Sequence, residues 1–419
     1  MVKNKKIAAG VGLITALATL AACGGTAGDN AGGGAPGVTT DTIKIGLFGP
    51  MSGSAAVFGK GINTVDAMYK AINDSGGING RKFEIVIEDD KCDAATARLA
   101  VTKLIQQDKV FMLHGGECSA AVTAAMPIIK KSGIPYLIAG AASHSLVNPP
   151  TKNVFHGWAD NTGGTAADAM FVTSFAAANG GKAKIAIVTQ ADEWGKGWTG
   201  SFKKELEKAA SSNKVEITTE LDIAPNTTDA TAQVQQLKNS GADIAVVYAY
   251  PDPMSVFLRN KSAQNLDIPV VTGQGTYPED QLDRLGNVAT IGTFFSSYCM
   301  ADTLDSEALK PYRDATKKYY PQDKFDLSSM LGASGVDVNK QVFTEMGNEI
   351  TWANWISIAE NVKDLKSGGA PEPITYKPFA ENDPSSRLGV SACKLATLDP
   401  QGTITVIAPD WKAWKETDR

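Results

Sequence analysis

Short apolar runs alternate with amphipathic helical segments along most of the chain, and this alternation restricts the fold more than any other feature. Residues 42–50 alternate apolar and polar side chains as a strand does, whereas residues 58–75 place apolar side chains at helical spacing. The same order of strand and helix continues over residues 81–90, 95–108, 109–116, 119–133 and 134–143. Strands that alternate with helices predict a parallel sheet with helices on both faces.

The alternation begins again after about residue 163, without any repeat of the sequence itself. We therefore expect an α/β fold of two Rossmann-like, doubly wound lobes joined by a hinge. The segment after residue 298 is too irregular to form a third domain, so we divide it between the lobes. The predicted N-terminal lobe is 42–162 plus 298–372, and the predicted C-terminal lobe is 163–297 plus 373–419. Residues 387–409 predict a terminal β-hairpin.

The N-terminus has the pattern of an export signal. A lysine-rich head precedes an uncharged run at 7–22, which is short for a membrane span. Residues 20–23, Leu-Ala-Ala-Cys, resemble the bacterial lipobox. We expect a lipoprotein signal peptide at 1–22, a lipid on Cys23 and a flexible tether over 23–41. The alternative is an ordinary signal peptide cut near an Ala-x-Ala site, with Cys23 incidental.

The composition is that of a globular protein. Of 419 residues, 43% are hydrophobic and 20% are charged, and no stretch after the signal is long and apolar enough to span a bilayer. The net charge is −5. This acidic balance argues against a nucleic-acid partner.

The cysteines favour disulfides over a metal site. If Cys23 carries a lipid, an even set of four remains in an exported chain, and these four allow three connectivities. No Cys-x-x-Cys pair or His/Cys cluster is present. We therefore expect no metal and no cofactor, and the pairing stays open at this point.

The loops that follow the predicted strands are the expected place for a ligand, because open parallel sheets bind ligands beyond the carboxyl ends of their strands. In the first lobe, loops 49–61, 114–121 and 139–145 are rich in Gly and Ser, and the starts of predicted helices there suit an anion. The second-lobe loops bring aromatic residues: Trp194, Trp198, Tyr248, Tyr250 and Tyr277. The two walls together predict a site for a small carboxylate with an organic body. The alternative interpretation, which applies when each residue is considered alone, is that the serines cap helices and the aromatic residues lie on the surface.

Several ordered blocks of the sequence resemble a known family. "KIGLFGPMSGSAAVFGKG", "GGINGR", "GGECSAAVTAAMPI" and "DEWGKGW" are similar to segments of the type I periplasmic binding proteins. The resemblance is to the leucine/isoleucine/valine-binding branch of ABC transporter substrate-binding lipoproteins, over roughly residues 42–410. It implies a periplasmic binding protein type I fold whose two lobes close on a ligand.

The resemblance also implies roles for individual residues. The family's disulfide matches Cys92 with Cys118, which leaves Cys299 to pair with Cys393. Ser119 matches a serine at the ligand's carboxylate, and Ala141 and Ser143 match contacts of the next loop. The implied aromatic contacts are Phe58, Trp194 and Tyr250, the last near the ligand's ammonium.

One position departs from the family pattern. The amino-acid binders carry a glutamate that pairs with the ammonium, and here that place falls at or near Gly275. A buried ammonium is costly without a carboxylate. We therefore expect an aromatic or short aliphatic acid as ligand, with a branched-chain-type amino acid or an amide as alternatives. Glu117, Glu193 or Asp252 would be the substitute carboxylate if an amino acid binds.

The function expected from these patterns is capture of a small solute outside the cytoplasm, by a monomer, and delivery to ABC permease subunits. Its lipid would hold the chain to the membrane at the cell surface or in the periplasm. A sensor module of the same fold is the alternative. An exported enzyme is disfavoured, because His114, His144 and His156 lie near no nucleophile motif, and we assign no catalytic residue.

Overall fold

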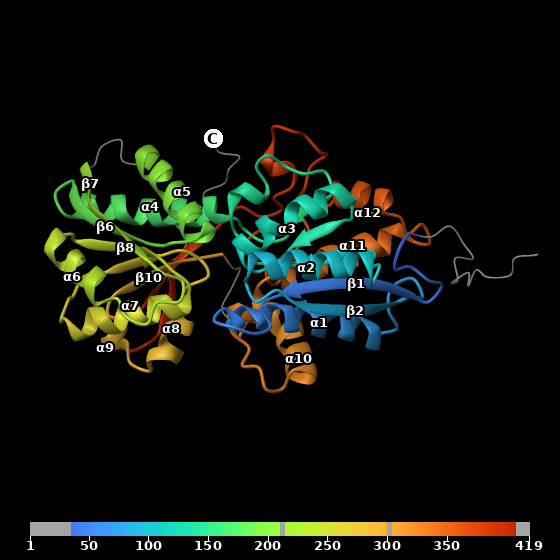
Figure 1. The fold of residues 1–419 in the computed structure, drawn as a ribbon, viewed down its shortest axis with the longest axis horizontal. Helices are drawn as coiled ribbons and strands as arrows, with labels where there is room; N and C mark the ends of the chain where they lie inside the picture. The colour runs from blue at the N-terminus through green and yellow to red at the C-terminus, as the bar shows by residue number, and fades with distance from the viewer. Residues whose placement is uncertain (1–34, 210–213, 300–303, 408–419) are drawn as a thin grey trace, which may run out of the picture. The chain divides into compact units, whose positions relative to one another are not determined.

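The computed structural model describes residues 35–209, 214–299 and 304–407. The predicted signal peptide and the predicted lipidation site Cys23 lie outside these residues. Within them, the chain forms two lobes, each built on one β-sheet (Figure 1). None of the described helices is long and apolar enough to cross a membrane.

The first lobe has a five-stranded parallel sheet in the order β2-β1-β3-β4-β5. The central strand β1 is almost entirely buried, as its apolar pattern predicts. The strands of this sheet are β1 (Thr42–Gly49), β2 (Lys82–Asp89), β3 (Met112–Gly115), β4 (Tyr136–Ile138) and β5 (Val154–His156).

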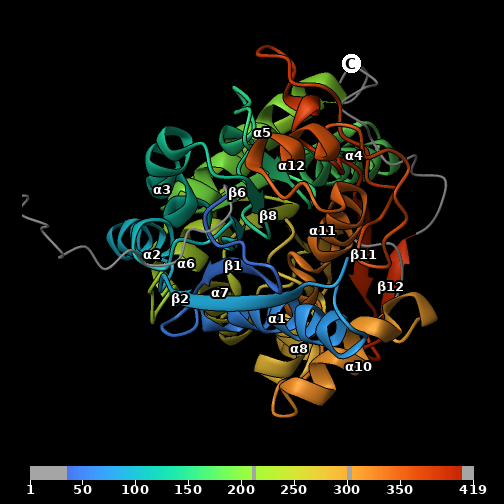
Figure 2. The ribbon, with the colours of Figure 1, turned by 90° about the vertical axis from the view of Figure 1, so that its right-hand side faces the viewer.

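Helices from two distant parts of the sequence cover this sheet. Early helices connect its strands: α1 (Gly59–Asp74), α2 (Ala94–Gln106) and α3 (Ser119–Ser132). Later helices pack against the same lobe: α10 (Lys310–Tyr319), α11 (Ala333–Met346) and α12 (Trp352–Ala359). Figure 2 shows α1 beside α10, where the hydroxyl groups of Thr64 and Thr316 are hydrogen-bonded at 3.0 Å.

The second lobe has a seven-stranded sheet in the order β12-β11-β10-β9-β8-β6-β7. Its strands run in one direction except β11, which is antiparallel to both of its neighbours, β10 and β12. The strands are β6 (Lys182–Gln190), β7 (Lys214–Ile223), β8 (Ile244–Tyr248), β9 (Val270–Thr272), β10 (Phe294–Tyr298), β11 (Lys394–Leu398) and β12 (Ile404–Ile407).

The helices of the second lobe precede or connect its strands. They are α4 (Asn161–Ala178), α5 (Glu193–Ala209), α6 (Thr231–Ser240), α7 (Pro251–Ala263), α8 (Pro278–Leu285) and α9 (Val288–Ile291). Short 3₁₀ turns complete the description: η1 (Ala56–Phe58), η2 (His144–Leu146), η3 (Glu307–Leu309), η4 (Ser328–Met330) and η5 (Pro384–Ser386). The chain thus leaves the first lobe after β5, returns to it after β10, and re-enters the second lobe with β11.

The predicted α/β fold of two doubly wound lobes is confirmed, and so is the terminal hairpin. Its turn closes through hydrogen bonds between Asp399 and Thr403, at 2.9 Å, and between Gly402 and Asp399, at 3.0 Å. Both expected disulfides are present: Cys92 is bonded to Cys118, and Cys299 to Cys393.

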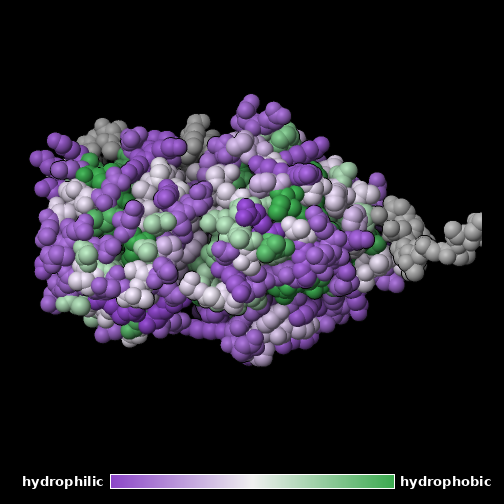
Figure 3. Space-filling model, in the orientation of Figure 1, coloured by the Kyte–Doolittle hydropathy of each residue, from purple (hydrophilic) through white to green (hydrophobic). Residues whose placement is uncertain are grey.

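The apolar side chains are concentrated inside the lobes. On the face shown in Figure 3, hydrophilic residues cover most of the surface and apolar residues lie scattered among them. Among the described residues, the large hydrophobic side chains that are exposed are Leu99 and Ile217. The candidate site therefore has to be sought where the lobes meet, not on an open apolar face.

Candidate ligand-binding site

A small cavity lies where the strand-end loops of the two lobes meet. The first lobe contributes Phe58, Glu117, Gly140, Ala142 and Leu331, and the second contributes Trp194, Tyr250, Gln274 and Gly275. Its volume, about 10 Å³, is that of a single water-sized sphere. The lobes are therefore closed tightly around this point.

The loop between β3 and α3 places Glu117 in the cavity. Gly115 and Gly116 have φ values of 131° and 82°, in the region that favours glycine. A Cβ on Gly116 would lie 2.4 Å from the Tyr136 hydroxyl oxygen, so a side chain does not fit there. This tight turn brings Glu117 to the carboxyl edge of the sheet, directly before the disulfide-bonded Cys118.

The Glu117 carboxylate is buried and unpaired. Its residue is 4% exposed, and among the described residues its carboxylate meets no cation and no side-chain donor, while the backbone N–H of Gly140 favours its charged form. The Gly140 N–H also donates to the Gly116 carbonyl oxygen, at 3.2 Å. Burial, together with the like charge of Asp90, holds the pKa of Glu117 well above its usual range.

Asp90 adds a second buried carboxylate at the same edge of the sheet. It follows β2, accepts a hydrogen bond from the Cys92 N–H at 2.8 Å through Oδ1, and leaves Oδ2 unpartnered. Burial raises the pKa of Asp90 to about 6. This end of the cavity is therefore acidic.

Aromatic rings from both lobes form the opposite wall. The Phe58 ring meets the Tyr250 ring edge-on, with centroids 5.1 Å apart. Tyr250 also packs against Trp194 at 4.7 Å, and Trp194 against Trp198 at 5.6 Å. Edge-to-face and offset contacts at these distances are favourable. The contact between Phe58 and Tyr250 crosses from one lobe to the other.

The Trp194 ring covers the position where the family's glutamate was expected. A Cβ on Gly275 would lie 3.4 Å from Trp194 Cζ2, and Gly275 has a φ of 96°. Its neighbour Gln274 is hydrogen-bonded to the segment that connects β5 with α4. Its Oε1 accepts from Trp158 Nε1 at 3.0 Å, and its Nε2 donates to the Ala159 carbonyl at 2.6 Å. The second lobe thus supplies no carboxylate to the cavity lining.

The structure brings together five of the eight ligand-binding residues expected from the sequence: Phe58, Glu117, Trp194, Tyr250 and Gly275. The other three lie just behind the lining and bond to protein groups. Ser119 Oγ accepts a hydrogen bond from the Ser143 N–H at 3.2 Å. The Ala141 carbonyl accepts one from His156 Nε2 at 2.6 Å.

Sequence reasoning missed Leu331, which reaches the cavity from a turn after η4. No strand-end pattern marks this residue. Gly140, Ala142 and Gln274 lie in loops that the sequence did single out, but as small or neutral residues they carried no chemical signal.

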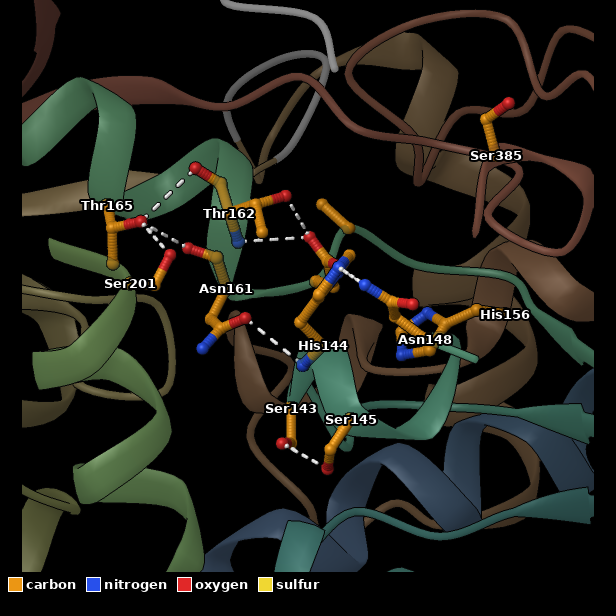
Figure 4. A network of polar contacts seen from close by, with 12 residues as sticks. Ser143, His144, Ser145, Asn148, His156, Asn161, Thr162, Thr165, Ser201 and Ser385 are labelled. Carbon is orange, nitrogen blue, oxygen red and sulfur yellow. Dashed lines mark hydrogen bonds and ion pairs between the residues drawn. The ribbon is translucent and has the colours of Figure 1, made fainter. Parts of the chain in front are cut away.

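A polar network lies beside the cavity (Figure 4). His144 Nδ1 is 2.6 Å from Asp160 Oδ2, and its Nε2 is 3.0 Å from Asn148 Nδ2. The hydroxyl groups of Ser143 and Ser145 bond to each other at 2.9 Å.

Comparison with known proteins agrees with this geometry. The model of the periplasmic binding protein family matches residues 42–382. The chain belongs to this family. The resemblance predicted from the sequence is thereby confirmed.

Individual relatives share the family at low identity. The chain is 28% identical, over 242 residues, to a leucine-, isoleucine-, valine-, threonine- and alanine-binding protein of Pseudomonas aeruginosa. That alignment covers 57% of this chain and 62% of the relative, so it spans less than two thirds of the relative's length.

Solved structures share the fold. The isoleucine complex of a branched-chain amino acid transporter substrate-binding protein from Streptococcus pneumoniae has a TM-score of 0.74 and 21% identity, and covers 88% of this chain and 100% of its own. A solute-binding protein from R. palustris with 4-hydroxybenzoate has a TM-score of 0.70 and 21% identity, and covers 88% of this chain and 99% of its own. Both similarities concern the fold.

Proposed function

We propose that the chain is an extracytoplasmic solute-binding protein of an ABC importer, and that it captures a small organic acid or amino acid in the cavity between its lobes. The observation that carries this proposal is the cavity itself. It is lined by the strand-end loops of both lobes, where doubly wound sheets bind ligands. The rings of Phe58 and Tyr250 close over it from opposite lobes.

The names of the relatives and neighbours support the solute class. The Pseudomonas relative is an amino-acid-binding protein, and neighbours of the same fold are complexes with isoleucine or with 4-hydroxybenzoate. The proposed act is binding and release, not catalysis, because these relatives are binding proteins. A lipid on Cys23 and a slack tether would keep the chain near its permease and raise its local concentration there.

Thermal unfolding against a library of amino acids, aromatic acids and aliphatic acids tests the capture step. A solute at 100 times its dissociation constant should add about 2.7 kcal/mol of stability. Trp194→Ala, which truncates a cavity wall, should weaken binding by about 2 kcal/mol or more. If no library member raises the unfolding temperature, the proposal fails. Conversion of a bound solute, followed by NMR, would instead reveal an enzyme.

Delivery and anchoring have their own tests. Uptake of the identified solute by cells should fall when this chain is deleted and return when it is restored. Mass spectrometry of the mature protein should find acyl chains on an N-terminal Cys23. A mature N-terminus at any other residue would reject the lipid anchor while leaving the capture step intact.

A further inference from the structure

We propose that the Glu117 subsite recognises the ammonium group of the solute, which is therefore an amine or an amino acid and not a simple carboxylic acid. This inference rests on the proposed function, because it concerns the same cavity. It differs from the expectation drawn from Gly275, which favoured a ligand without an ammonium. The two carboxylates differ in origin, since Glu117 comes from the first lobe and the family's glutamate belongs to the second.

The Glu117 carboxylate lacks a counter-charge in the described part of the chain. Both of its oxygens are buried, and among the described residues they meet no cation and no side-chain donor. A buried carboxylate is costly unless a cation or several donors meet it. An ammonium group supplies a positive charge and three donors, which is what this carboxylate lacks.

The charge beside Glu117 has the same sign as its own. The charge that acts most on Glu117 is Asp90, of the same sign and also with an unpartnered oxygen. Without a cation beside it, Glu117 holds its proton. An ammonium would favour the ionised carboxylate and pair with it, whereas a ligand with only a carboxylate would disfavour that form.

The aromatic wall also suits an ammonium. Phe58, Trp194 and Tyr250 all line the same small cavity as Glu117. Aromatic faces attract cations, and cages of such rings recognise ammonium ligands. The rings therefore favour the same charge on the ligand as the carboxylate does.

Gly140 shows that the backbone is fitted to this carboxylate. A Cβ on Gly140 would lie 2.0 Å from Glu117 Oε2. Gly140 has no positive φ, so its conformation alone does not require glycine. The space it leaves is the space that the Glu117 carboxylate occupies.

Matched triads of solutes test the proposal by titration calorimetry on the full chain. Each triad holds an amino acid, the acid without its amino group and the amine without its carboxyl group. The triads are alanine, propanoate and ethylamine; leucine, 4-methylpentanoate and 3-methylbutylamine; and phenylalanine, 3-phenylpropanoate and 2-phenylethylamine. We expect an ammonium-bearing member to bind, and to bind about 100-fold more tightly than the acid of its triad.

Two substitutions sharpen the test. Glu117→Gln keeps the shape but removes the charge, and should lower the affinity for the ammonium-bearing solute by about 100-fold. Asp168→Asn is the matched control, because Asp168 is also fully buried with an unpartnered oxygen but does not line the cavity. It should leave the affinity unchanged. If Glu117→Gln does not fold, the comparison of acid with amine on the unaltered chain still decides the matter.

The outcomes separate this proposal from the proposed function. An acid that binds as tightly as the ammonium-bearing members of its triad, or unchanged affinity in Glu117→Gln, overturns the role of Glu117 while capture of a solute stands. The same holds if only ammonium-free members of the wider library bind. If no solute of any kind binds, the proposed function itself fails.

Discussion

Glu117 and Gly140 pack as a single unit at the residue scale. The carboxylate lies over the bare Cα of the glycine, on a loop that is separated from it by twenty-odd residues of sequence. Gly140 carries no chemical group, yet this contact makes it part of the site. A substitution at Gly140 can therefore move the carboxylate without altering Glu117.

Gly140→Ala should therefore impair recognition of an ammonium. The added Cβ would lie 2.0 Å from Glu117 Oε2, so the carboxylate has to move. We expect the affinity for the ammonium-bearing solute to fall by about tenfold or more, in calorimetry. Gly200→Ala is the control, because its Cβ meets nothing within 4 Å, and alanine favours the α5 helix. Equal affinities of the two variants would contradict this packing argument.

Asp90 makes a second residue-scale prediction, on the pH dependence of stability. Its pKa is about 6 in the folded protein, against about 3.9 in an unfolded chain. The folded state thus holds the Asp90 proton more tightly than the unfolded chain does. The stability that Asp90 gains from this proton is complete below about pH 4 and is lost as the pH rises through about 6.

Asp90→Asn should consequently stabilise the protein at pH 7 but not at pH 4. The amide oxygen can still accept from the Cys92 N–H, and the charge that burial penalises is gone. A difference of about two pKa units corresponds to about 3 kcal/mol in the free energy of unfolding at pH 7. Urea unfolding of both proteins at the two pH values measures it. The other groups facing Asp90 are Asp89, Asp93, Glu117 and Tyr136. An equal gain at both pH values would point to packing and not to titration.

At the scale of elements, the sequence predicted those parts of the site that follow long, periodic strands. The loops after β3 and β6 could be found because their strands and helices have clear apolar periods, and they carry Glu117 and Trp194. Strand β5 was missed because it is only three residues long and no helical pattern separates it from β4. Leu331 was missed because it arrives from a distant return of the chain, which no local pattern reveals.

The elements α8, α9 and β10 were also not predicted. The eight-residue α8 begins at Pro278, at the end of a loop that was read only for its aromatic residues. Strand β10 contains Ser296 and Ser297, and it is recognisable as a strand mainly by its pairing with β9 and β11. Such pairing is tertiary information, so propensity alone did not reveal it.

The disulfides tie elements that the site depends on, and their loss should be unequal. The chain-entropy model gives about 3.5 kcal/mol for the 26-residue separation of Cys92 and Cys118, and about 4.7 kcal/mol for the 94-residue separation of Cys299 and Cys393. Replacing both cysteines of a pair by serine should lower the urea concentration at which the protein unfolds, and more so for Cys299 and Cys393 than for Cys92 and Cys118. Only the first pair adjoins Glu117, so only its loss should also weaken solute binding. The reverse order of stability would reject the entropic account.

For the whole molecule, the decisive feature is that contacts outside the cavity also join the lobes. Ser145 Oγ donates to Glu193 Oε1 at 3.3 Å, and Ser328 Oγ donates to Asp280 Oδ2 at 3.3 Å. Both bonds run from the first lobe to the second. They stabilise the closed arrangement whatever the ligand is, because a hinge motion that separates the lobes breaks them.

The double variant Ser145→Ala/Ser328→Ala should therefore separate closure from recognition. Losing these two bonds disfavours the closed state, so every solute that binds should bind more weakly, by about tenfold at most. The ratio of affinities between an amino acid and its des-amino acid should stay the same, because neither serine lines the cavity. Calorimetry with leucine and 4-methylpentanoate measures both quantities, and small-angle scattering should show a larger radius of gyration with solute absent. Glu117→Gln should do the opposite, changing the ratio and leaving that radius unaltered. If the double variant changes the ratio instead, closure and recognition are not separable in this protein, and the selectivity cannot be assigned to the Glu117 subsite alone.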